Sequence, residues 1–212
     1  MPTGFPQDSS ETRRRFGIPE EAKVVVTAGV LAPRKNLEVL IKCLPLVGMK
    51  DLFLLVMGDA SRTADLSYQE HLRELVRKLD LEKRVRFTGW LDKEEVWRLY
   101  RASDLFILPS LKEGMPNALL EALGADLPCL ASNIPGIRDI LSHEELMFDP
   151  LDDGGLSLKL NLFFTDKDYA RRVSQLCLEQ KKKFCFAWKE RVFEMVTTIS
   201  SRSCPIGFHG HE

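Results

Sequence analysis

Long apolar runs are absent from this sequence, and so is an excess of charge of one sign. No apolar run approaches the roughly 20 residues that a membrane-spanning helix needs. The opening MPTGFPQDSSETRRR lacks the apolar core of a secretory signal peptide. A formal net charge of −1 over 212 residues gives no general attraction to nucleic acid. We therefore expect a globular protein that binds no nucleic acid.

Two nucleotide-binding motifs are absent, which excludes further classes of protein. No G-x-G-x-x-G follows the first predicted strand, which counts against a dinucleotide oxidoreductase. No G-x-x-x-x-G-K-[ST] occurs, which counts against a P-loop protein. The five cysteines form no C-x-x-C pair, and Cys43 and Cys129 lie in apolar runs typical of buried, reduced thiols. Reduced thiols favour a cytoplasmic location.

Apolar, β-rich runs alternate along the chain with segments of helical period. Several runs are continuously apolar, as in parallel strands that are covered on both faces. The predicted strands are 23–29, 52–58, 84–89, 104–110, 128–132 and 145–150. This alternation predicts an α/β fold, a Rossmann-like open parallel sheet of about six strands with helices on both faces. Ligands of such sheets bind beyond the carboxyl ends of the strands.

Local signals mark several helix ends and packing residues. Asn36 is predicted to cap the helix that follows it, and Asp92 with Glu95 forms a capping box before the next amphipathic segment. The short runs Arg13–Arg15 and Lys181–Lys183 are interpreted as solvated helix faces. The aromatic residues Trp90 and Trp97 are interpreted as packing residues.

One main domain is expected. Residues 1–22, which carry three prolines, are interpreted as a linker-like segment that leads into it. Residues 23–200 form the predicted ligand-binding domain together with its C-terminal helices, and residues 201–212 form a flexible tail.

Three loops after apolar strands carry chemistry. In GVLAPRKN, Gly29 permits a close turn, while Arg34 and Lys35 place two cations just before a helix start. Cations beside the free N–H groups of a helix N-terminus form an anion site. A plain basic surface turn is the alternative. In MGDASR, Asp59 suits a turn or cap as well as a ligand contact.

The loop EGMPNALLE combines a helix start with two carboxylates. Gly114 lets the backbone approach a ligand, Pro116 suits the first helical turn, and Met115 to Ala118 are predicted to offer free N–H groups. Glu113 and Glu121 would repel phosphate but are good acceptors for hydroxyl groups. A buried capping Glu113 and a solvent-facing Glu121 on an ordinary helix are the alternative.

The loops GVLAPRKN and EGMPNALLE both follow apolar strands, so they belong at the same edge of the predicted sheet. One supplies cations, and the other supplies helix N–H groups flanked by two hydroxyl acceptors. A ligand with hydroxyl groups at both ends and phosphates between them fits this order. The combination therefore indicates a nucleotide sugar.

At these residues the chain resembles the C-terminal, donor-binding domain of a GT-B-fold glycosyltransferase of family 4, also called group 1. The resemblance rests on GVLAPRKN, VMGDA, LEKRVRFTGWL, DLFILPS, the E-x7-E motif EGMPNALLE, EALGADLPCLASNIPGIRDI, FDPLDD and FAWKERVFEMV. It implies glycosyl transfer from a UDP-, GDP- or ADP-sugar with retention of configuration, without a metal or another cofactor. It also implies an acceptor-binding N-terminal domain, to which nothing in this sequence corresponds, so the chain resembles a fragment or a stand-alone donor module.

The resemblance assigns roles to individual residues. Lys35, assisted by Arg34, is implied to contact the diphosphate, Glu113 the sugar hydroxyls, and Glu121 the ribose. Backbone close to the donor is implied at Gly29, Gly114, Met115, Pro116, Asn117 and Ala118, and the loop that borders the base comprises Gly89, Trp90 and Leu91.

Three positions depart from the family pattern. Val30 stands where an arginine commonly grips the diphosphate, so Arg34 would have to substitute for it. Asp126 replaces a usual glycine, and Pro135-Gly136 with Asp139 replaces a glycine pair and a glutamate. A non-catalytic nucleotide-sugar-binding module is therefore the alternative function. If the acceptor is membrane-bound, Lys181–Lys183 would be a candidate for peripheral membrane contact.

Overall fold

The computed structural model describes residues 9–60 and 66–184. Six strands form one sheet in the order β3-β2-β1-β4-β5-β6, and each neighbouring pair is parallel. The strands are β1 Lys23–Ala28, β2 Leu52–Met57, β3 Val85–Phe87, β4 Leu105–Leu108, β5 Cys129–Ser132 and β6 Met147–Phe148. The predicted open parallel sheet is confirmed, with each strand inside or close to its expected run.

The central strands are the most deeply buried. Every residue of β2, β4 and β5 is buried, and Val25 of β1 pairs with Leu54 on one side and Leu105 on the other. Apolar side chains cover both faces of these strands, so no polar face is needed. This explains why their sequences are continuously apolar.

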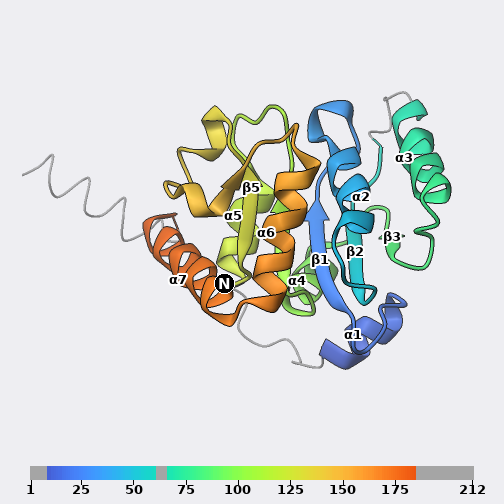
Figure 1. The fold of residues 1–212 in the computed structure, drawn as a ribbon, viewed down its shortest axis with the longest axis horizontal. Coiled ribbons are helices and arrows are strands. Elements are labelled where there is room, and N and C mark those ends of the chain that lie inside the picture. Colours follow the sequence, from blue (N-terminus) through green and yellow to red (C-terminus); the bar gives the residue numbers. More distant parts are fainter. Residues whose placement is uncertain (1–8, 61–65, 185–212) are drawn as a thin grey trace, which may run out of the picture.

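Helices cover both faces of the sheet (Figure 1). They are α1 Ser9–Arg15, α2 Leu37–Leu46, α3 Ser67–Lys78, α4 Lys93–Arg101, α5 Asn117–Gly124, α6 Asp153–Thr165 and α7 Lys167–Phe184. Helix α2 packs against α3 and α6, whereas α7 packs against α5 and α6. Right-handed crossovers that run outward in opposite directions from β1 and β4 place α2 and α5 on opposite faces.

Of the two predicted helix N-terminal caps, the one at α4 is confirmed and the side-chain cap at α2 is wrong. Asp92 and Glu95 form the expected capping box at α4. Asn36 precedes α2, but it has φ 50° and ψ 44° and its side chain makes no capping hydrogen bond. Its Nδ2 donates instead to the carbonyl oxygens of Pro150 at 2.6 Å and Pro109 at 3.3 Å. The side chain thus joins three loops rather than ending one helix.

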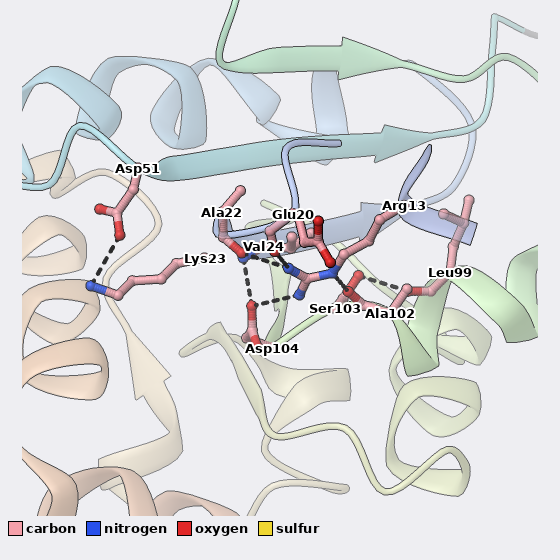
Figure 2. Close-up of polar contacts among 10 residues, drawn as sticks. All are labelled: Arg13, Glu20, Ala22, Lys23, Val24, Asp51, Leu99, Ala102, Ser103 and Asp104. Carbon is pink, nitrogen blue, oxygen red and sulfur yellow. Dashed lines mark hydrogen bonds and ion pairs between the residues drawn. The ribbon is translucent and has the colours of Figure 1, made fainter. Parts of the chain in front are cut away.

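Arg13 is a structural residue, so its interpretation as part of a solvated face was wrong. Its side chain is only 17% exposed and lies 3.4 Å from Asp104 Oδ2, which also accepts from the N–H of Val24 at 2.7 Å (Figure 2). The guanidinium also donates to three carbonyl oxygens, those of Glu20, Ala22 and Ala102. Helix α1 lies within the predicted linker-like segment, and these bonds together with its packing on α4 fix it to the domain.

The basic run in α7 is also partly tied into the fold. Lys181 Nζ donates to Asp126 Oδ1 at 2.5 Å, and Lys183 Nζ donates to Gln180 Oε1 at 3.2 Å. Asp126 has φ 61°, a conformation that favours glycine, which accounts for the glycine usual in the family. The FAWKERVFEMV segment, Cys185, Cys204 and the predicted tail at 201–212 lie outside the described residues.

Candidate donor-binding site

The candidate site lies where the strand order reverses. Strand β1 pairs with β2 on one side and with β4 on the other, and the chain runs outward from these two strands in opposite directions. The loops that follow β1 and β4 therefore flank a crevice at the carboxyl edge of the sheet. A small hollow at this edge is lined by residues of both loops, among them Gly29, Val30, Lys35 and Pro109.

Two glycines let the loops after β1 and β2 touch. Gly58 has φ 125°, and a Cβ added there would lie 2.0 Å from the carbonyl oxygen of Gly29. Gly29 has φ 143°, and a Cβ there would meet Lys35 Cε at 3.6 Å. The Lys35 side chain thus lies against Gly29, where the missing Cβ leaves room for it.

Lys35, Ser110 and Glu113 meet at a single carboxylate oxygen. Lys35 Nζ donates to Glu113 Oε1 at 2.5 Å, and Ser110 Oγ donates to the same oxygen at 2.6 Å. The Glu113 side chain is 5% exposed and that of Lys35 is 13% exposed. A buried carboxylate needs such partners, because desolvation otherwise disfavours its charge. Glu113 is therefore buried, as in the alternative interpretation, but its carboxylate bonds to Lys35 and Ser110 and does not cap α5.

Arg34 completes the cationic side of the site. Its backbone oxygen accepts from the N–H of Leu111 at 2.8 Å, which joins the loops after β1 and β4. Its Nη1 lies 3.9 Å from Glu113 Oε2, and its side chain is 51% exposed. The structure thus brings together Arg34, Lys35 and Glu113, the residues to which the resemblance assigned contacts with the diphosphate and the sugar hydroxyls.

Helix α5 begins beside this cluster, at Asn117. Pro116 is buried at the N-cap position, where it lacks an N–H, while Met115 is 68% exposed. Gly114 is exposed, and an added Cβ would meet nothing within 4 Å. The N–H of Asn117 was expected to be free, but it donates to the carbonyl oxygen of Met115 at 3.0 Å. Fewer donors are therefore open at this helix start than the sequence indicated.

Glu121 lies in the second turn of α5 and is half-buried. Burial raises the pKa of its carboxyl group, and the charge of Lys93 opposes part of that rise. Within the described ranges Glu121 forms no ion pair, and no hydrogen bond links it to Lys35 or Glu113. Glu121 is thus a partly desolvated acceptor that stands apart from the Lys35–Glu113 pair.

The loop after β3 lies next to the loop after β2. The N–H of Gly58 donates to the carbonyl oxygen of Gly89 at 3.0 Å, and Gly89 has φ 71°. Trp90 is 60% exposed, so its interpretation as a packing residue was wrong, whereas Leu91 is partly buried against the core. Trp97, in contrast, packs edge-on against Tyr100, with 6.3 Å between the ring centroids.

Asp59 takes the structural role that the sequence left open. Its Oδ1 accepts from the N–H of Ala60 at 2.8 Å and from Gln69 Nε2 at 2.7 Å. The carboxylate therefore stabilises the turn after β2 and links that turn to α3.

Gly136 sets the position of the Glu113 backbone. A Cβ added at Gly136 would lie 2.6 Å from the carbonyl oxygen of Glu113 and 3.0 Å from that of Gly114. The short 3-10 helix Pro135–Ile137 therefore packs directly against the E-x7-E loop. The departure from the family pattern at Pro135-Gly136 keeps a glycine where the backbone needs one.

Cys43 and Cys129 match the expectation of buried thiols, and Cys177 shares this environment. Cys43, Cys129 and Cys177 are free and buried, and burial raises the pKa of Cys43 to about 12. In the described part of the chain, no three His, Cys, Asp or Glu side chains are grouped so that they could hold a metal ion. Across residues 9–60 and 66–184, no helix has the length and apolar character needed to cross a membrane.

The fold and the geometry at the reversal point define a Rossmann-like α/β domain with cations beside a helix start. A family model described as glycosyl transferases group 1 matches residues 8–176. The chain therefore belongs to the group 1 glycosyl transferase family. The resemblance deduced from the sequence is confirmed for the family and for the fold, which is one half of a GT-B glycosyltransferase.

Three relatives illustrate the similarity. Mannosylfructose-phosphate synthase of Agrobacterium fabrum is 27% identical over 197 residues, covering 90% of this chain and 43% of that protein. The lipopolysaccharide core biosynthesis glycosyltransferase LpsD of Rhizobium meliloti is 32% identical over 164 residues, covering 76% and 45%. The crystal structure of Anabaena Alr3699/HepE in complex with UDP and glucose has a TM-score of 0.80 at 22% identity, covering 93% and 53%. The chain thus spans about half the length of these relatives.

Proposed function

We propose that this chain binds a nucleotide sugar at the carboxyl edge of its sheet and supplies the donor half of a retaining, metal-independent glycosyl transfer. The observation that carries the proposal is the pairing of Lys35 with Glu113 beside the start of α5, at the reversal point of the sheet. The similar HepE structure contains UDP and glucose, which supports this class of ligand.

Each group in the site has a role that suits its chemistry. Lys35 and the start of α5 would hold the diphosphate, because an ammonium group and a helix N-terminus both favour anions. Glu113 would accept from hydroxyl groups of the sugar, and Glu121 from those of the ribose. Gly89–Leu91 would border the base.

Catalysis in this proposal is electrostatic. As the anomeric bond breaks, negative charge develops on the departing nucleoside diphosphate, and preorganised cations and N–H groups stabilise it. Lys35 and Arg34 stand where they would supply this charge. The acceptor would bind to a second domain, consistent with relatives about twice as long as this chain.

A binding-only module is the second candidate, and Val30 is the residue that favours it. Val30 lines the hollow at the end of β1, where an arginine would add a further contact with the diphosphate. By analogy with the loss of one oxyanion-hole donor, the missing contact would cost about 2.7–4 kcal/mol of transition-state stabilisation. Arg34, with a half-exposed side chain 3.9 Å from Glu113, would be the cation that replaces it.

Calorimetric titration tests the shared part of both candidates. We expect one of the nucleoside diphosphates UDP, GDP and ADP to bind, together with the nucleotide sugar built on it. NAD and ATP should not bind. The Lys35→Ala variant should bind the nucleoside diphosphate more weakly, and unchanged affinity would contradict the diphosphate assignment. Transfer of sugar when the chain is joined to an acceptor domain separates the enzyme from the binding-only module.

A further inference from the structure

Ser110 is the one member of the Lys35–Ser110–Glu113 cluster without an assigned role. It lies two residues beyond β4 and is completely buried. Its hydroxyl donates to Glu113 Oε1 at 2.6 Å, the same oxygen that accepts from Lys35 at 2.5 Å. A serine hydroxyl bound to a buried carboxylate makes a charge-assisted hydrogen bond, which is stronger than a neutral one.

The two oxygens of Glu113 have different surroundings. Both short hydrogen bonds go to Oε1. In the described part of the chain, the charged group near Oε2 is Arg34 Nη1, at 3.9 Å and beyond hydrogen-bonding distance. The carboxylate is therefore anchored through one oxygen, and the other retains its capacity to accept.

Binding of a ligand would disturb only one of the two hydrogen bonds to Glu113 Oε1, the one from Lys35. An ammonium group that turns to a diphosphate weakens its bond to Glu113, whereas the Ser110 hydroxyl is completely buried and already donates its one proton to Glu113. A buried carboxylate that loses its cation is strongly destabilised unless other donors hold it.

We propose that Ser110 is a positioning residue that holds Glu113 by Oε1, so that Oε2 remains directed at a sugar hydroxyl while Lys35 binds the diphosphate. This inference rests on the proposed function and adds to it a residue that touches neither sugar nor phosphate. A merely structural Ser110 would affect all ligands alike, whereas a positioning role affects only the part of the affinity contributed by the sugar.

The test compares two ligands on each variant. Calorimetry gives the affinity for UDP, GDP or ADP and for UDP-glucose, GDP-mannose or ADP-glucose, and the readout is the gain in affinity that the sugar provides. Ser110→Ala should reduce this gain by about tenfold to 150-fold, the effect of one hydrogen bond to a charged group, with the diphosphate affinity within twofold of the original protein. Ser110→Thr keeps the hydroxyl and should restore the gain.

A matched control is available in the neighbouring strand. Ser132 is also completely buried, and its hydroxyl donates to the carbonyl oxygen of Leu108 at 3.4 Å, away from Glu113. Ser132→Ala should leave the sugar-dependent gain unchanged, and thermal unfolding of all variants identifies any general loss of fold.

The outcomes separate this inference from the function on which it rests. If the original protein binds none of the nucleotides, the proposed function is wrong. If it binds them and Ser110→Ala retains the full sugar-dependent gain, or weakens both ligands equally, the positioning role is wrong and the proposed function stands. A selective loss in Ser110→Ala, with Thr restoring the gain, supports the role.

Discussion

Gly136→Ala tests whether the backbone beside the E-x7-E loop holds Glu113 in place. Gly136 does not have a positive φ, so alanine meets no intrinsic backbone strain there. The added methyl group would nevertheless lie 2.6 Å from the Glu113 carbonyl oxygen, whereas ordinary contacts begin at 3.4 Å. The clash involves backbone atoms, which cannot rotate away as a flexible side chain would. One of the two segments must therefore move by about 0.8 Å, the difference between these distances.

Both stability and ligand binding should respond to this displacement. Overpacking of this kind costs about 1–3 kcal/mol, which lowers the melting temperature of a chain of this size by about 3–10 °C. The displaced Glu113 also loses its alignment with Lys35 and Ser110, so we expect about a tenfold loss of affinity for the nucleotide sugar. Thermal unfolding and calorimetric titration measure the two effects.

Gly48→Ala is the matched control. Gly48 is exposed, and an added Cβ there would meet nothing within 4 Å. Its melting temperature and ligand affinity should match those of the original protein. If Gly136→Ala behaves like Gly48→Ala in both assays, the backbone contact does not position Glu113 and the reasoning is refuted.

Three further substitutions test other parts of the structure. Burial raises the pKa of Glu121, so the folded protein favours the protonated carboxyl group more than the unfolded chain does. The carboxyl group therefore stabilises the fold at low pH, and this contribution is lost as the pH rises through the raised pKa. Thermal unfolding should show Glu121→Gln to be more stable than the original protein near pH 7 but not near pH 4. Equal stability of the two proteins at both pH values would contradict this. The variant should also bind nucleoside diphosphate more weakly. Arg13→Met should lower the free energy of unfolding by about 3 kcal/mol in a denaturant titration, whereas the exposed Arg14→Met changes it little, and similar values for both would deny Arg13 its structural role. In the same titration, Asn36→Ala should be less stable than Asn36→Gly by about 1 kcal/mol. Both variants lose the two hydrogen bonds of the Asn36 side chain, but of the two new residues only glycine tolerates φ 50° without strain. Equal stability of the two variants would argue against backbone strain at this position.

The sheet could be predicted because its signal is local. Each of the central strands, such as Leu52–Met57, is a short run of apolar residues whose neighbours also lie in the sheet. Burial on both faces dictates this composition directly. The positions of Lys35 and Glu113 followed from the same logic, since loops after neighbouring parallel strands must meet at one edge.

Residues with distant partners could not be predicted in this way. Arg13 bonds to Ala102, 89 residues away, and Asn36 bonds to Pro150, 114 residues away. In sequence, the first is one arginine in a charged run and the second is an ordinary helix-capping residue. Ser110 lies only three residues before Glu113, but a serine after a strand is also typical of turns, so its hydrogen bond left no distinctive pattern.

The contact between Lys35 and Glu113 has a consequence for selectivity among anions. Lys35 already has an internal counter-ion, so any incoming anion must compete with a carboxylate held 2.5 Å away. Free phosphate or sulfate would draw the ammonium group away and give Glu113 nothing in return. A ligand that joins a phosphate to a sugar compensates both partners at once, because its hydroxyl groups can satisfy the released carboxylate. If the proposed function is right, the resting ion pair would therefore disfavour small anions such as free phosphate relative to a nucleotide sugar.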